Sequence, residues 1–330
     1  SVVTYVYIHQ IFGLSFNVMS VFDIRDTRLE YRDQIIPTVP LLGYLITNQG
    51  NVINPFLMAV GAARGRWEMV LLGVAGQIVL YSTTGYKTVL ISIPICILLA
   101  VIFKYRKSFA GITVVFAATM LVWVSIIIDR IASIGLVDIL VSRVFLTAGY
   151  LMPLYLQAYE KNPPALWAYS FLASFIESPY STSPGFFVAE SQLQRPDIQL
   201  NASLFADGYA NLGLLGIAIE AIALVLILVL IDRLSNGLPL AIVIPVSVLP
   251  VFSLANGSPF TSVLSYGFLL MGLLFLLIPR NYLTISRGGK KAALRAGGRS
   301  LFDSMLVPPS LWNQKNRRSG TGAAEDLGDS

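Results

Sequence analysis

Three arginines in one short polar segment have the spacing of a phosphate-binding helix face. In VFDIRDTRLEYRDQ, Arg25, Arg28 and Arg32 are three and four residues apart, and the acidic residues of the segment follow the same spacing. Every charged pair at helical distance is therefore of like sign, which destabilises an isolated solvated helix. Because the planar guanidinium group binds phosphate oxygens through two hydrogen bonds, we predict that these arginines bind a phosphate. The alternative is that they anchor a helix end at a membrane surface.

A lysine beside three hydroxyl side chains forms a second candidate anion site. In LYSTTGYKTVL, Lys87 follows Ser82, Thr83, Thr84 and Gly85 at the start of an apolar run. If a helix begins there, its first amide groups and its dipole favour a negatively charged ligand. The competing interpretation is a lysine whose ammonium group only reaches the membrane surface.

Aromatic and polar residues are mixed through residues 129–210, a segment too long and too polar for a simple connection. Aromatic rings offer flat apolar faces to sugars, and amide groups can bond sugar hydroxyls. The alternative for any single aromatic residue is a place in the belt at the membrane surface. Within this segment we expect residues 137–159 and 165–176 to form interfacial or re-entrant helices. The candidate sugar-binding residues are Tyr155, Tyr159, Tyr209 and Asn211.

The elements that must position these residues are membrane helices. Hydrophobic residues make up 55% of the chain, charged residues make up 12%, and the mean hydropathy is +0.70. This composition excludes an ordinary soluble domain, and several apolar runs approach the roughly 20 residues that a helix needs to cross a bilayer. We predict an all-α, polytopic transmembrane helical bundle of about eight spans. The predicted spans are residues 1–22, 35–63, 68–81, 86–103, 109–128, 212–231, 238–254 and 260–278.

The positions of the basic residues predict how the chain is oriented. Lysines and arginines near residues 65, 105 and 233 and beyond 279 fall on alternate connections, as expected if all of them face the cytoplasm. The net charge of +5 comes mostly from the C-terminal residues, and it favours membrane lipid over nucleic acid as their partner. We therefore expect a transmembrane domain over residues 1–279, a large extracytoplasmic loop within it over 129–210, and a basic, flexible cytoplasmic tail over 280–330.

Several ligand classes are excluded by the residue types that the sequence lacks. Cys96 is the single cysteine and His9 the single histidine, which excludes a disulfide framework, histidine metal clusters and Ser-His-Asp triads. No Walker, dinucleotide-binding or Asp-x-Asp motif is present. We therefore expect neither a cofactor nor a metal. The sequence begins at Ser1 without a methionine, and we expect further spans to precede it.

Five short segments together resemble the bacterial O-antigen polymerases, the Wzy-type polymerases of oligosaccharide repeat units. They are VFDIRDTRLEYRDQ, INPFLMAVG, LYSTTGYKTVL, SRVFLTAGYLMPLYLQAY and NASLFADGYANLGLLG, and they span most of residues 20–220. The resemblance implies a metal-independent glycosyltransferase in the bacterial inner membrane. Such an enzyme joins undecaprenyl pyrophosphate-linked oligosaccharides at the periplasmic face to build a surface polysaccharide, and it can have a chain-length regulator protein as its partner.

The resemblance also implies roles for individual residues. Asp207, in the last of the five segments, is the first choice for the general base, and Glu190 is the second. The alternative for Asp207 is an N-cap of the following helix, and we expect Gly213 and Gly216 to serve close helix packing. The candidate pyrophosphate-binding residues are Arg25, Arg28, Arg32, Lys87 and Arg143, of which Arg143 would also act in catalysis.

Two other functions remain open from the sequence. An O-antigen ligase would use the same donor, but the resemblance would then require a histidine in the large outer loop, which contains none. A non-enzymatic flippase or transporter of lipid-linked oligosaccharides would also need cations for the pyrophosphate. Transporters commonly show internal repeats, and we find no clear repeat in this chain.

Overall fold

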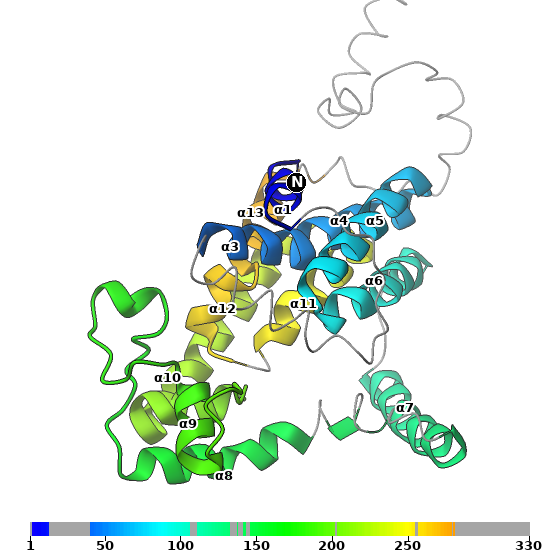
Figure 1. The fold of residues 1–330 in the computed structure, drawn as a ribbon. Coiled ribbons are helices and arrows are strands. Elements are labelled where there is room, and N and C mark those ends of the chain that lie inside the picture. The colour runs from blue at the N-terminus through cyan, green and yellow to red at the C-terminus, as the bar shows by residue number, and fades with distance from the viewer. Residues whose placement is uncertain are drawn as a thin grey trace, which may run out of the picture.

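The computed structural model describes residues 2–12, 40–105, 111–132, 137, 141–142, 146–201, 203–254, 257–278 and 280. Regular structure in these residues is entirely helical, which confirms the predicted all-α class (Figure 1). The arginine segment with Arg25, Arg28 and Arg32, the candidate Arg143 and the tail after Arg280 lie outside the described residues. Their predicted roles stay predictions.

The N-terminal half and parts of the later helices form the main apolar core. Helices α4, α5, α6 and α11 pack on one another, and the buried side chains between them include Ala59, Met69, Ala100 and Ile242. Glycines at positive φ, Gly65 after α4 and Gly85 after α5, end their helices in the left-handed conformation. These elements are α1 (Val2–Phe12), α3 (Pro40–Asn48), a π-helix (Gln49–Ile53), α4 (Asn54–Arg64), α5 (Trp67–Thr84), α6 (Lys87–Tyr105) and α11 (Leu240–Leu254).

A network of neutral polar side chains surrounds the π-helix inside this core. The Gln77 amide donates to the Gly50 carbonyl at 2.9 Å and to the Ser92 hydroxyl at 2.8 Å, while its oxygen accepts from Asn54 at 3.2 Å. Asn54 in turn accepts from the Gln49 amide at 2.7 Å. Buried amides need partners in apolar surroundings, and here they supply them to one another and to the π-helix backbone.

Two helices are long and apolar enough to cross a membrane, α6 and α10 (Leu204–Ser235), among the described residues. A third span results if α12 (Pro259–Ser265) and α13 (Phe268–Leu277), which are bent by 58°, cross as one unit. The expected membrane-length helices are thus confirmed, while the predicted number of spans and the orientation stay predictions. Helix α11 is apolar but only 15 residues long, and it continues through Pro245 and Pro250.

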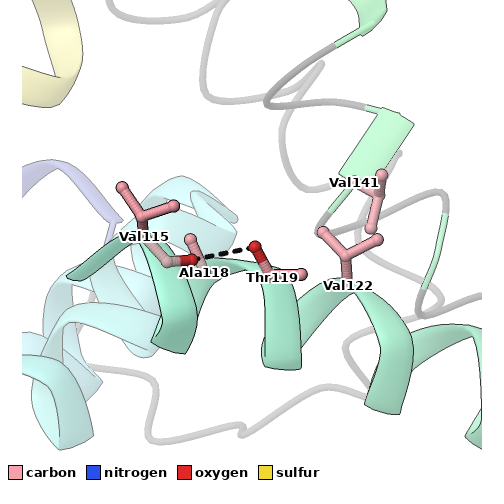
Figure 2. Close-up of a pocket in the computed structure, with 5 residues that line it drawn as sticks. All are labelled: Val115, Ala118, Thr119, Val122 and Val141. Atoms are coloured by element: carbon pink, nitrogen blue, oxygen red, sulfur yellow. Dashed lines mark hydrogen bonds between the residues drawn. The ribbon is translucent and has the colours of Figure 1, made fainter. Parts of the chain in front are cut away.

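Helix α7 (Gly111–Ala132) lies apart from the other described helices (Figure 1). Most of its large apolar side chains are exposed, including Phe116 and Trp123. A shallow depression on this helix is lined by apolar side chains and Thr119, whose hydroxyl donates to the Val115 carbonyl at 2.9 Å (Figure 2). With no charged lining residue and its one hydroxyl already bonded within the helix, this depression is unsuited to a phosphate or a sugar.

The segment after α7 differs from its prediction. Helix α8 (Thr147–Glu160) confirms a helix in the second half of residues 137–159. The helix predicted over 165–176 is wrong, because this stretch consists of turns and a short 3-10 helix, Phe171–Ser174. Leu166 and Trp167 both have a φ of 54°, which no right-handed helix accommodates. Helix α9 (Pro184–Leu193) follows and packs against α8.

Helix α10 folds back on itself near its first third. Leu212 and Gly213 have non-helical backbone angles, and Gly213 has a φ of 59° and a ψ of −140°. In a straight helix Gly208 and Gly216 would lie about 12 Å apart, but here a Cβ on Gly216 would stand 1.9 Å from the Gly208 carbonyl oxygen. The predicted close packing is therefore found at Gly216. Gly213 instead supplies a backbone conformation, since a Cβ there would meet nothing within 4 Å.

Replacing Gly216 with alanine should disrupt this fold-back. The new methyl group would overlap backbone atoms, which cannot move away as the end of a side chain can, and we expect a loss of at least about 1–3 kcal/mol. Gly149→Ala on α8 is the matched control, because a Cβ there has open space. The thermal unfolding midpoint of the purified protein in detergent measures both. Equal midpoints for the two variants would contradict the fold-back.

Candidate functional site

The fold-back of α10 surrounds one buried carboxylate with hydrogen-bond donors. Asp207 is 7% exposed, and its Oδ2 accepts the Tyr169 hydroxyl at 2.5 Å and the Asn211 amide at 3.1 Å. The Asn211 amide nitrogen also lies 2.8 Å from the Tyr169 hydroxyl oxygen. These two donors fix the orientation of the carboxylate, and a carboxylate can accept a proton from a further group.

Backbone groups left without helix partners hold the loop that carries Tyr169. The interruption at Leu212 and Gly213 removes the amides that would bond the carbonyls of Ala210 and Asn211 in a continuous helix. Those carbonyls accept instead from the amides of Ala165 at 2.9 Å and Leu166 at 3.4 Å. The next amide, of Trp167, donates to the Asn211 side-chain oxygen at 2.6 Å. These three bonds fix the positive φ angles of Leu166 and Trp167, a conformation that costs energy and persists only where surrounding contacts impose it.

A second buried carboxyl group, which the sequence analysis missed, lies beside Asp207. Glu220 is fully buried, and its Oε1 accepts the Trp167 indole N–H at 2.7 Å and the Ser258 hydroxyl at 3.1 Å. The two carboxyl groups interact electrostatically. The signal that could have found Glu220 is its place as the lone ionisable residue in the apolar run IAIEAIALVLILVLI, since ionisable residues inside such runs mark functional sites.

The predicted sugar-binding residues gather around Asp207 in one aromatic cluster. Tyr155 and Tyr159 on α8 are buried there with Ala206 and Ala210, and Tyr209 packs against them. The Tyr155 hydroxyl is already used, because it donates to the Leu200 carbonyl at 2.8 Å. The Tyr159 hydroxyl is buried with no hydrogen-bond partner among the described residues. Asn211, the fourth candidate, is fully buried and bonded to Tyr169 and Asp207.

Burial and the neighbouring carboxylate shape the chemistry of Tyr169. Loss of solvation raises the pKa of its phenol well above the usual value of 10.0, and the charge of Asp207 raises this pKa further. The phenol therefore keeps its proton throughout the physiological pH range. Tyr169 acts as a hydrogen-bond donor to Asp207 and not as a base.

Two predicted residues are exposed and do not belong to this buried cluster. Lys87 is the first residue of α6 and is exposed. The hydroxyls beside it face their own helix, because Ser82, Thr83 and Thr84 donate to carbonyls four residues earlier at 2.7–2.9 Å. Glu190 lies exposed on α9. Of the two predicted bases, Asp207 alone belongs to the buried cluster.

The alternative role of Asp207 as a helix N-cap is wrong. Ser203 occupies that position, and its hydroxyl accepts from the Ala206 amide at 3.5 Å. Asp207 follows in the first turn, and its side chain points to Tyr169 and Asn211. Its carboxylate is therefore not occupied by the helix end and is available to the cluster.

The described part of the chain offers few side chains that could bind a metal together. No three His, Cys, Asp or Glu side chains gather there in a way that could hold an ion. Asp207 and Glu220 are two carboxyl groups whose neighbours are hydroxyl, amide and indole groups. This arrangement suits proton transfer.

Comparison with known proteins identifies no family or function for this chain. No protein-family model, no curated protein and no solved structure matches the chain. The case for a function therefore rests on the residues and their geometry.

Removing the Tyr169 hydroxyl should weaken the cluster. Tyr169→Phe leaves the Asp207 Oδ2 with Asn211 as its remaining side-chain donor among the described residues, and the loss of a bond to a buried charged group costs about 1–3 kcal/mol. The thermal unfolding midpoint in detergent should fall accordingly. Tyr150→Phe is the control, because Tyr150 on α8 is 73% exposed. An unchanged midpoint for Tyr169→Phe would show that the short hydrogen bond contributes nothing.

Proposed function

We propose that the chain is a polymerase of lipid-linked oligosaccharide repeat units, with Asp207 as its general base. The observation that carries the proposal is the Asp207 carboxylate, which is buried beside an aromatic cluster and held by Tyr169 and Asn211. Asp207 also lies in NASLFADGYANLGLLG, one of the segments that resemble the O-antigen polymerases. Geometry and resemblance thus point to the same residue.

The proposed reaction needs one base and one site for a leaving pyrophosphate. Asp207 removes the proton from an acceptor sugar hydroxyl, and the hydroxyl oxygen forms a bond to the anomeric carbon of the donor. The bond between that carbon and the undecaprenyl pyrophosphate breaks, and its electron pair leaves with the phosphate oxygen. The cations proposed to stabilise that charge are Arg25, Arg28, Arg32, Lys87 and Arg143.

The aromatic cluster supports a sugar as the acceptor. Tyr159 stands 5.4 Å from the ring of Phe187 and 5.8 Å from that of Tyr180, and Tyr180 and Phe187 are 4.4 Å apart. Tyr180 and Phe187 are only partly buried, so this wall offers aromatic faces near the base. Because the donor carries its own leaving group, the proposed reaction at the periplasmic face of the inner membrane requires neither a nucleotide nor a metal.

A transporter of lipid-linked oligosaccharides is the second candidate, favoured by one observation. The helix α10 is interrupted at Leu212 and Gly213 beside two buried carboxyl groups, Asp207 and Glu220. Interrupted helices and buried ionisable groups also form the ion and substrate sites of transporters. The two functions differ in the product that accumulates when Asp207 is neutralised.

Asp207→Asn should abolish polymerisation because the amide cannot accept the proton. In cells that depend on this chain, electrophoresis of the lipid-linked glycans should show single repeat units, with polymer reduced by about 100-fold or more. Glu190→Gln is the control and should retain long chains, because Glu190 is exposed on α9. Normal polymer in Asp207→Asn would remove Asp207 as the base, and repeat units trapped on the cytoplasmic side would favour the transporter.

Arg143→Lys tests the proposed pyrophosphate contact. Lysine keeps the charge but cannot reproduce the bidentate geometry of a guanidinium group, so chain length should shorten markedly at equal membrane abundance. Arg130→Lys is the matched control, since Arg130 is exposed in the last turn of α7. If both variants make chains of normal length, Arg143 serves as an anchor at the membrane surface.

A further inference from the structure

Glu220 has no role in the proposed reaction, although several contacts hold its side chain in place. It lies 13 positions after Asp207, about 20 Å away along a continuous helix. The fold-back at Leu212 and Gly213 brings the two carboxyl groups into contact range. A hydrogen-bonded chain also links them, since Asn211 bonds Asp207 and Trp167, and Trp167 bonds Glu220.

The two oxygens of Glu220 differ in their surroundings. Oε1 accepts from the Trp167 indole and the Ser258 hydroxyl. Oε2 is equally buried but has no hydrogen-bond partner among the described residues. A charged carboxylate oxygen without a donor is unfavourable in a buried site, whereas an oxygen that carries a proton is itself a donor and can point to a neighbouring acceptor. Asp207 is that neighbour.

The charges around Asp207 and Glu220 also favour a proton on one of the two carboxyl groups. Among the described residues, the titratable side chains that face the pair are the phenols of Tyr155 and Tyr159 from α8 and of Tyr169 from the loop. Helices α11, α12 and α13, which pack on α10, contain no ionisable residue. Two negative charges would therefore lie together without a cation among their contacts in the described part of the chain, and two such carboxyl groups commonly share one proton.

We propose that Asp207 and Glu220 share a single proton, held on Glu220 Oε2, and that Glu220 is a positioning residue for Asp207. Trp167 and Ser258 fix Glu220 through Oε1, which leaves Oε2 to face Asp207. The pair then carries one negative charge, on Asp207, where Tyr169 and Asn211 stabilise it. When Asp207 takes a proton from the acceptor hydroxyl, both carboxyl groups are neutral, and a proton must leave to restore the pair. Loss of the shared proton at alkaline pH would place two charges in the cluster and stop turnover.

Glu220→Gln separates this role from a purely structural one. A glutamine oxygen can accept from Trp167 and Ser258, and its N–H₂ group can donate toward Asp207 as the protonated acid does. We expect the unfolding midpoint of Glu220→Gln to equal that of the unmodified protein. Glu220→Ala should lower the midpoint, because the Trp167 and Ser258 donors then lose their acceptor. A Glu220→Gln protein that fails to fold would overturn the proposal.

Infrared spectroscopy of the purified protein at neutral pH detects the proton directly. The C=O stretch of a buried protonated carboxylic acid should be present in the unmodified protein, absent in Glu220→Gln and retained in Glu190→Gln. Absence of the band from the unmodified protein, or its persistence in Glu220→Gln, would show that Glu220 does not hold the proton. This readout and the unfolding midpoints do not depend on the proposed polymerase function.

The pH profile of polymerisation rests on the proposed function. In the unmodified protein, activity should fall about tenfold per pH unit once the shared proton is lost, and Glu220→Gln should lack this alkaline decline. The same decline in both proteins would overturn the positioning role. If the infrared band behaves as expected but no polymer forms at any pH, the proton pair stands and the polymerase assignment fails.

Discussion

The arrangement of the candidate site depends on one backbone constraint, the need to pair two carbonyl groups where α10 is interrupted. Ala210 and Asn211 lose their helical donors at the turn through Leu212 and Gly213. Both residues are buried, so water cannot replace those donors, and an unpaired buried carbonyl is costly. The amides of Ala165 and Leu166 complete these bonds. The position of the loop after α8 is therefore set by α10 and not by its own helix propensity.

The side-chain chemistry follows from this backbone pairing. Once Ala165 and Leu166 are fixed, Trp167 can reach both the Asn211 side chain and Glu220, and Tyr169 can reach Asp207. On the other side, Gly208 and Gly216 allow the two arms of α10 to touch. The polar cluster depends on these two glycines. A larger residue at either position would push the two arms of α10 apart and separate Asp207 from Glu220.

The sequence was informative where local pattern decides the structure and misleading where distant contacts decide it. Continuous apolar runs predicted helices such as α6 correctly to within a few residues, and composition indicated a membrane protein. The helix predicted over 165–176 is wrong because the loop amides donate to carbonyls about 45 residues later, and these bonds hold Leu166 and Trp167 at positive φ. Asp207 was found through a motif. Glu220 could have been singled out as the lone ionisable residue of its apolar run, but its place beside Asp207 depends on the fold-back of α10, which no periodicity reveals.

Two buried polar networks in this molecule differ in what chemistry they permit. The network around the π-helix consists of amide and hydroxyl groups such as Asn54, Gln77 and Ser92, which stabilise a backbone irregularity and exchange no proton at physiological pH. The network around α10 contains Asp207 and Glu220, whose carboxyl groups can gain or lose a proton. A purely structural role at the fold-back could be filled by amides at lower cost, as the first network demonstrates, because burying carboxyl groups requires additional donors. The presence of two acids at the second network therefore supports the proposed transfer of a proton there.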